Sequence, residues 1–232
     1  MRRMKLFFGI VILCTSCSAS KFLVSDVKSA AINEMLKIEP FSYISLIEQG
    51  NMSATYNDSI SNYAKIVLNE ALEIFRGRLN LSSEEIEIID SFERKALEQE
   101  LNFLIMSAER NRSINNIPIT PLIDSMLIAN NKRFGLIVVQ NGFTRAKGNH
   151  GGQIAKGVGM GIITGILTMG MVSSYQVPTK ANSTLYAVIV DSENKNIAFY
   201  NKSVMQDKEP TEKENITKQL HKVFEKYFWK KR

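Results

Sequence analysis

The sequence contains little of the chemistry on which most enzyme and metal sites depend. Only two cysteines and two histidines occur among its 232 residues. It contains no HExxH or GxSxG motif and no acidic cluster with the spacing of a metal site. Both cysteines, Cys14 and Cys17, lie near the N-terminus, so a hydrophobic core must stabilise the rest of the chain. We therefore expect a protein that is not an enzyme and that uses no cofactor and no metal.

The two histidines are the remaining candidates for catalysis. His221 lies between Lys218 and Lys222 in an amphipathic stretch, which predicts a place on the solvated face of a helix. His150 lies in a glycine-rich loop, where its side chain is free to act as a ligand or a base. A lone loop histidine is more often solvated, so an envelope enzyme using His150 is only the third hypothesis for function.

The N-terminus has the pattern of an export signal. Three basic residues precede a short apolar run, Leu6–Leu13, which is far shorter than the ~20 residues of a membrane-spanning helix. Removing this leader would take away three positive charges and no acid, which lowers the formal net charge from +6 to +3. A chain with so small an excess of charge gives little support for nucleic-acid binding, and we expect none.

The residues after the apolar run resemble the bacterial lipobox, whose cysteine carries lipid after cleavage. Thr15 and Ser16 are small and stand directly before Cys17, whereas Cys14 occupies a position where the lipobox has an aliphatic residue. Ordinary signal cleavage near Ser18 or Ala19 therefore stays open as an alternative. The resemblance implies a signal peptide over 1–16, lipidation at Cys17, and an outer-membrane lipoprotein that faces the periplasm, because Ser18 is not the aspartate that favours the inner membrane.

Hydrophobic patterning predicts an α+β fold: a mixed sheet of about four to five strands with helices packed on it, and a C-terminal β-hairpin followed by a helix. The predicted domains are a lipid-anchored tether with a short helix over 17–40 and a single α+β domain over 41–232. The predicted strands are 41–47, 135–139, 184–190 and 197–200, and the predicted helices are 26–37, 58–77, 122–130 and 210–228.

The stretch between residues 82 and 110 allows two interpretations. Ser82 and Glu85 form a capping box that favours one long helix. Asp90 and Glu93 form a second capping box, which would leave residues 85–89 as a strand. We favour the long helix.

The order of these elements is similar to a lipoprotein fold shared by three groups of proteins. They are the curli secretion channel subunit, the outer-membrane activators of penicillin-binding proteins, and the N-terminal domain of the TolB translocation protein. The resemblance rests on a turn at Asn141–Arg145, the hairpin at Ile189–Ile197, and the stretch Ile89–Gln99. The chain also resembles surface lipoproteins of gut-type Gram-negative bacteria. Members of the fold group bind partners or assemble into rings and share no catalytic residues, so the resemblance implies no active site.

An uncharged segment of 16 residues, Gly157–Val172, contains five glycines and lies within a predicted insertion at 148–183. It does not form a phosphate loop, because no Lys-Ser/Thr pair follows and the next acid is Asp191. Gly157, Gly161 and Gly165 form two GxxxG steps, which would allow close helix contact. The apolar run is shorter than the ~18 residues that indicate a membrane span. Its glycines alternate with apolar residues as in a pore-lining hairpin only as far as Gly161.

Two interpretations of this segment remain open. It is either a connection buried over the sheet or an oligomerisation or membrane contact through its glycines. The leading hypothesis for the whole chain is a non-catalytic, lipid-anchored envelope protein in an accessory or scaffold role. Its expected partners are outer-membrane lipid, through Cys17, and either an envelope protein or a second copy of the chain. The alternative is a subunit of an oligomeric outer-membrane export channel that uses residues 157–172.

Overall fold

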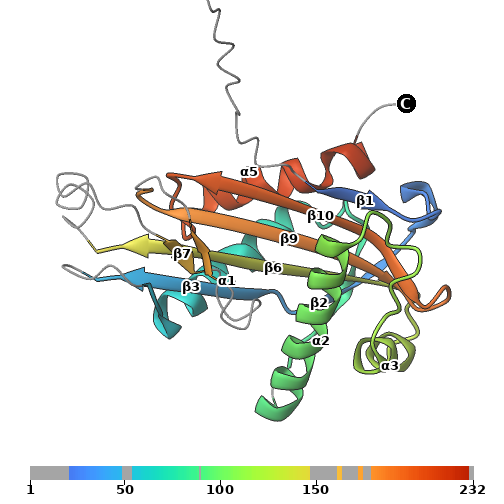
Figure 1. Ribbon diagram of the computed structural model, residues 1–232. Helices are drawn as coiled ribbons and strands as arrows, with labels where there is room; N and C mark the ends of the chain where they lie inside the picture. Colours follow the sequence, from blue (N-terminus) through green and yellow to red (C-terminus); the bar gives the residue numbers. More distant parts are fainter. Residues whose placement is uncertain are drawn as a thin grey trace, which may run out of the picture.

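The computed structural model describes residues 21–48, 54–88, 90–146, 161–163, 172–174 and 179–229. An eight-stranded mixed sheet with helices on both faces forms its centre (Figure 1). The strands are β1 (Phe22–Val24), β2 (Met35–Ile38), β3 (Phe41–Ile47), β4 (Thr55–Tyr56), β5 (Leu81–Ile86), β6 (Phe134–Arg145), β9 (Asn182–Asp191) and β10 (Asn196–Gln206). The helices are α1 (Asp58–Ile74), α2 (Ser91–Arg110), α3 (Pro121–Ala129) and α5 (Lys213–Phe224), with short helical turns at Ser29–Ala31 and Glu225–Trp229.

Strand β6 organises the sheet because it has neighbours along both edges. On one edge it pairs antiparallel with β9, which continues through β10 to β1. On the other edge its first residues pair parallel with β2 and its later residues pair parallel with β3. Strand β5 extends the sheet beyond β2, and the short β4 pairs with the far end of β3.

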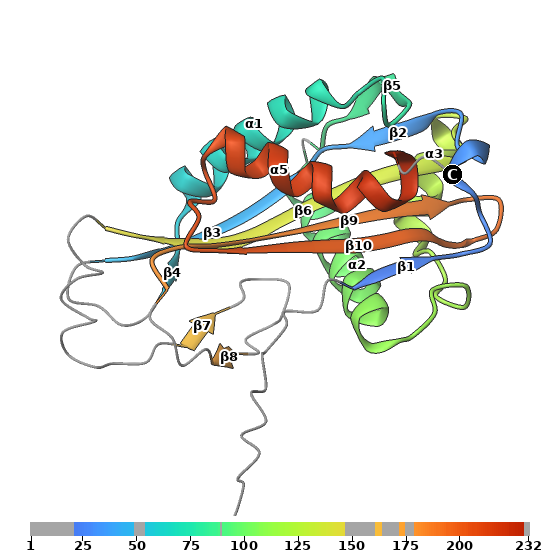
Figure 2. The same cartoon turned by 90° about the horizontal axis from the view of Figure 1, so that it is seen from above.

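The two faces of the sheet carry separate hydrophobic cores, because successive side chains of a strand point to opposite sides. Leu136 and Val138 of β6 pack with α1 and α5, whereas Ile137 and Val139 pack with α2 and α3. Figure 2 shows the resulting layers, with α1 and α5 together on one side of the sheet. The predicted α+β class is confirmed, as is the C-terminal hairpin β9–β10 followed by α5.

The short helix predicted over 26–37 is wrong. Residues Met35–Ile38 form β2, a strand buried on both faces, and Phe22–Val24 already form β1 of the same sheet. A strand buried on both faces lacks the alternation that marks a half-buried strand, so periodicity does not distinguish it from a helix. The boundary predicted at residue 41 is therefore also wrong, since the sheet includes two strands from the segment assigned to a tether.

The charge of Lys37, which gives β2 the pattern of an amphipathic helix, is paired with two partly exposed carboxylates. The Lys37 side chain is buried, and its Nζ lies 2.6 Å from Glu73, 2.8 Å from Glu85 and 2.8 Å from the Asn69 side-chain oxygen. Hydrogen bonds from Arg76 and Lys37 lower the pKa of Glu73 to about 2. Two carboxylates and an amide thus replace the water that a buried ammonium loses.

The single long helix favoured for residues 82–110 is also wrong. Leu81–Ile86 form β5, which pairs parallel with β2, and α2 begins only after Asp90, whose carboxylate accepts from the Phe92 N–H at 2.8 Å. The second capping box therefore marks the helix start. The polar residues of β5 would also suit the exposed face of a helix, so the local pattern does not distinguish the two structures. The segment forms a strand because it pairs with β2.

The turn expected at Asn141–Arg145 is absent because these residues continue β6. Gly142 pairs with Ile44 of β3 on one side and with Ser183 of β9 on the other. The strand therefore extends to Arg145, well past its predicted end at Val139. No turn can form where both edges of the strand are already paired.

Candidate interaction surfaces on helices α1 and α2

Helix α2 packs through one face and leaves the other to solvent. The inward residues recur at helical spacing, so they form a single apolar stripe against the sheet. They are Leu97, Leu101, Leu104, Ile105 and Ala108. Among the described residues, neither α2 nor any other helix combines the length and apolar character needed to cross a membrane.

The first turns of α2 are fixed by an ion-pair cluster that joins three elements. The Arg94 guanidinium donates to Glu39 at 3.1 Å and lies over the Phe41 ring, 5.3 Å from its centre. Lys65 of α1 donates to the same carboxylate at 2.6 Å. Burial alone would raise the pKa of Glu39, but Lys65, the Ile88 backbone N–H and Arg94 hold the pKa below its usual range. The cluster thus connects α1, the β2–β3 link and α2.

The later turns of α2 are fixed by two further carboxylates. Glu100 accepts from the backbone N–H groups of Leu122 and Ile123 at 3.3 Å, at the positive end of the α3 dipole. Glu109 accepts from the Tyr200 hydroxyl at 2.5 Å and pairs with Lys202 of β10. Burial and the nearby Glu109 charge raise the pKa of Tyr200 above its usual range. Helix α2 is therefore a rigid platform for the residues on its outer face.

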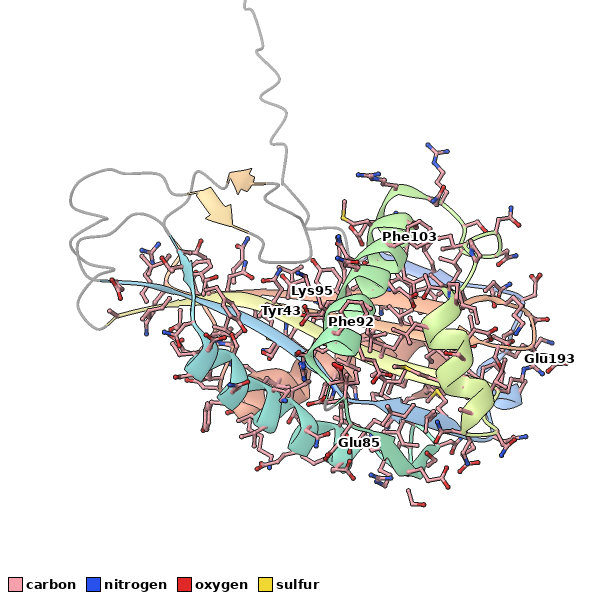
Figure 3. All side chains as sticks on the ribbon, turned by 90° about the horizontal axis from the view of Figure 1, so that it is seen from below. Tyr43, Glu85, Phe92, Lys95, Phe103 and Glu193 are labelled. Atoms are coloured by element: carbon pink, nitrogen blue, oxygen red, sulfur yellow. The ribbon has the colours of Figure 1, made fainter. Side chains whose placement is uncertain are left out.

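Two phenylalanines lie on that outer face. The Phe92 side chain is 81% exposed and Phe103 is 50% exposed, and Lys95 between them is also exposed (Figure 3). Eleven residues of α-helix make three turns, so the two rings lie on one face about 16 Å apart. We call Phe92, Lys95, Gln99 and Phe103 the α2 stripe. Two exposed aromatic rings on one rigid face are suited to bury against another protein surface.

Helix α1 carries a second exposed apolar surface, on the opposite side of the sheet. Tyr63, Ile66 and Ile74 are each more than half exposed, and we call them the α1 stripe. The opposite face of α1 packs on the sheet through Ala64, Val67, Leu68, Ala71 and Leu72. The predicted start of α1 is confirmed, since the Asn57 side chain caps it by accepting from the Ile60 N–H at 3.0 Å.

Most of the site residues predicted from the sequence lie outside the described residues. This applies to Cys17, His150, Gly157 and Gly165. Gly161 lies in a strand, β7 (Gly161–Ile163), which pairs antiparallel with β8 (Val172–Ser174), and its role in oligomerisation or membrane contact stays a prediction. His221 is exposed on α5, as expected, and its ring lies 4.9 Å from the Trp229 ring. Within the described ranges, no three His, Cys, Asp or Glu side chains come together as a metal site.

Sequence patterning alone does not single out the α2 stripe. Phe92 and Phe103 stand close in sequence to buried leucines, so each could equally belong to the core. Only one feature of the sequence indicates a second surface: two large aromatic residues stand three helical turns apart, on a different side of the helix from the leucines. The packing of α2 on the sheet decides which stripe is covered.

The chain was compared with known proteins, and no protein-family model and no curated protein sequence matches it. Among solved structures, it is similar to the PelC dodecamer from Paraburkholderia phytofirmans, with 8% sequence identity and a TM-score of 0.38 over 92% of this chain and 99% of that chain. A point variant of the same PelC dodecamer gives 9% identity and a TM-score of 0.40 over 91% of this chain and 100% of that chain. These TM-scores are too low to establish a shared fold, so the resemblance to the lipoprotein group stays a prediction.

Proposed function

We propose that this chain is a non-catalytic, lipid-anchored cell-envelope protein that acts through protein–protein contacts, including contacts with copies of itself. The α1 and α2 stripes carry this proposal. They are two unlike apolar surfaces on rigid helices at opposite faces of one sheet. A head-to-tail contact between copies requires two different, complementary surfaces, whereas a two-fold dimer uses one surface twice. We therefore favour a head-to-tail assembly held at the outer membrane, with no nucleic-acid partner.

The lipid anchor is tested by replacing the candidate cysteine. In a Gram-negative host, Cys17→Ala is expected to move the protein from the membrane fraction to the soluble periplasmic fraction and to abolish palmitate labelling, because no thiol remains for the acyl chain at that position. Cys14→Ala is the matched control, since it removes the other cysteine of the leader and should leave both readouts unchanged. Labelled, membrane-bound protein with Cys17 replaced would contradict the anchor.

Self-association is tested by changing each stripe separately in the detergent-solubilised chain. Phe92→Ser with Phe103→Ser removes both rings of the α2 stripe, and Ile66→Ser with Ile74→Ser removes the aliphatic part of the α1 stripe. Light scattering is expected to show an oligomer for the unchanged chain and the mass of a single processed chain for each double variant. Ile128→Ser, at a similarly exposed isoleucine of α3, is the control and should keep the oligomer.

Mixing the two double variants distinguishes head-to-tail contact from two-fold contact. The α1-stripe variant keeps an intact α2 stripe, and the α2-stripe variant keeps an intact α1 stripe. A head-to-tail contact therefore predicts that the mixture forms a one-to-one dimer that cannot grow further. A mixture that stays monomeric would contradict the contact between unlike stripes, and an unchanged oligomer in both variants would contradict any role of the stripes.

A second candidate function is a subunit of an oligomeric export channel that uses the glycine-rich insertion. The observation that favours it is the β7–β8 pair, which forms a two-stranded sheet separate from the eight-stranded one. The same light-scattering measurement on a chain without residues 154–175 separates the two candidates. Loss of the oligomer would favour the channel hypothesis, and an oligomer that persists would favour assembly through the stripes.

A further inference from the structure

A small polar cavity lies at the edge of the sheet, between α1 and α2. Its volume is about 210 Å³, and Phe41, Ser42 and Tyr43 of β3 contribute to its lining. It forms because no strand among the described residues pairs with this part of β3. Strand β5 pairs with β2 only, and β4 pairs with β3 only at Ser45 and Leu46.

Helix α1 replaces the missing strand at one point of this edge. The Ser61 hydroxyl accepts from the Ile44 N–H at 2.9 Å and donates to the Ile44 carbonyl at 3.2 Å. The side chain thereby satisfies both backbone groups of an edge residue, as a neighbouring strand would do. The space left between Ser61 and the ion-pair cluster at Glu39 is the cavity, so it is walled by the outer residues of α1 and α2.

The two helices give the cavity a positive end and a negative end. Along α1 the lining residues run from Asp58 to Lys65, and along α2 they run from Arg94 to Glu98. The helices are placed so that side chains of the same charge lie at the same end of the cavity. Lys65 and Arg94 share the Glu39 carboxylate, whereas the Asp58 and Glu98 charges both act, together with burial, to raise the pKa of Tyr56.

Neither end is electrically balanced by the described residues. At the positive end two cations share one carboxylate, and Arg94 contacts it through Nη2 only. At the negative end neither Asp58 nor Glu98 forms a salt bridge with a described residue. A bound molecule that carries a carboxylate toward the first end and a cation toward the second would complement both.

Tyr43 lines the same cavity, with its hydroxyl beside the Glu98 carboxylate. Only 4% of the residue is exposed. Its ring stacks on Phe41 with centres 6.4 Å apart, and Tyr56 lies 6.5 Å away, so the ring has little room to turn. Burial and the nearby Glu98 charge raise the pKa of Tyr43 above its usual range, which keeps the hydroxyl protonated. A neutral hydroxyl leaves the charge of the Glu98 carboxylate uncompensated, so a cation is still free to pair with it.

We infer that this cavity binds a small zwitterion whose ammonium and carboxylate groups are several bonds apart, as in an ω-amino acid. The ammonium donates to the Asp58 and Glu98 carboxylates, which lie at the negative end. The carboxylate of the ligand accepts hydrogen bonds from the Arg94 donors that Glu39 does not use, and the positive charge of Lys65 attracts it. Residues four apart on a helix are separated by about 6 Å along its axis, so Arg94 and Glu98 suit a ligand with about four carbon atoms. This site is separate from the two stripes and does not depend on the proposed function.

Three probes of equal chain length test the charge pattern. Calorimetric titration of the full chain with 4-aminobutyrate, butylamine and butyrate compares a zwitterion, a cation and an anion. We expect 4-aminobutyrate to bind at least about tenfold more tightly than either of the others, since only it complements both ends. Butylamine binding as tightly as 4-aminobutyrate, or no binding of any probe at millimolar concentration, would overturn the inference.

A variant and its control assign the contacts within the cavity. Glu98→Gln should weaken 4-aminobutyrate binding at least about tenfold without affecting butyrate, because it removes one of the two negative charges that face the ammonium. Glu93→Gln, on the same helix but outside the cavity lining, is the control and should bind normally. A thermal unfolding curve for each variant verifies folding, and unchanged 4-aminobutyrate affinity in a folded Glu98→Gln protein would overturn the assignment.

Discussion

Replacing Asp191 by alanine is expected to lower the free energy of unfolding by about 3–4 kcal/mol. The side chain is fully buried at the end of β9, where it accepts from Arg133 through Nε at 3.0 Å and Nη2 at 2.9 Å. It also accepts from the Glu193 N–H at 3.0 Å and from the Asn194 side chain at 2.9 Å, so it holds the turn between β9 and β10. Alanine would leave these donors without their shared acceptor.

Glu193 provides the matched control, because it pairs with the same arginine from an exposed position. Its side chain is 65% exposed, and an exposed ion pair contributes at most about 1 kcal/mol. Urea denaturation of Glu193→Ala should therefore give a midpoint close to that of the unchanged chain, with a clear downward shift only for Asp191→Ala. Equal losses in the two variants would show that burial of Asp191 is not the source of its effect.

The pKa of Asp191 predicts how its contribution to the free energy of unfolding depends on pH. Burial alone would raise the pKa of Asp191, but hydrogen bonds from Arg133 and from two backbone N–H groups hold the pKa below its usual range. Because the pKa is lower in the folded chain than in the unfolded one, the stabilisation is fully present above about pH 4 and is lost as the pH falls through the folded value. The difference in stability between the unchanged chain and Asp191→Ala should therefore narrow in acid.

Gly142→Ala is expected to lower the free energy of unfolding by about 3 kcal/mol. A Cβ atom at this position would lie 2.2 Å from the Asn182 carbonyl oxygen of β9 and 3.3 Å from the Ser183 Cα. The obstacle is backbone, which cannot move aside by changing a rotamer. Because β6 is paired with β3 on its other edge, it also cannot shift away from β9 without breaking a second ladder.

Gly77→Ala is the control for Gly142. No heavy atom lies within 4 Å of a Cβ added at Gly77, so alanine there should change stability by no more than about 1 kcal/mol, in the stabilising direction. Thermal and urea unfolding of both variants would measure the contrast. A Gly142→Ala protein as stable as Gly77→Ala would mean that β6 and β9 are not in contact as described.

The sequence by itself determined those elements whose ends are marked by local chemistry. Asn57 caps α1 at the start that the sequence predicts, because its side chain accepts from the Ile60 N–H. The turn residues after Asp191 join two strands into the expected hairpin. Each of these signals depends on a few neighbouring residues that satisfy the backbone groups of a helix end or a turn, so no distant contact is needed to interpret them.

Only the tertiary structure decided the elements whose partners lie far away in the chain. Leu81–Ile86 become a strand through pairing with β2, and the charge of Lys37 becomes compatible with a buried strand through Glu73 and Glu85. The cavity beside Tyr43 and the two stripes depend on which face each helix turns to the sheet. The physical reason is the same in each case. Strand pairing, charge compensation and burial depend on residues that folding brings together from distant parts of the chain, and local sequence patterning does not show which residues those are.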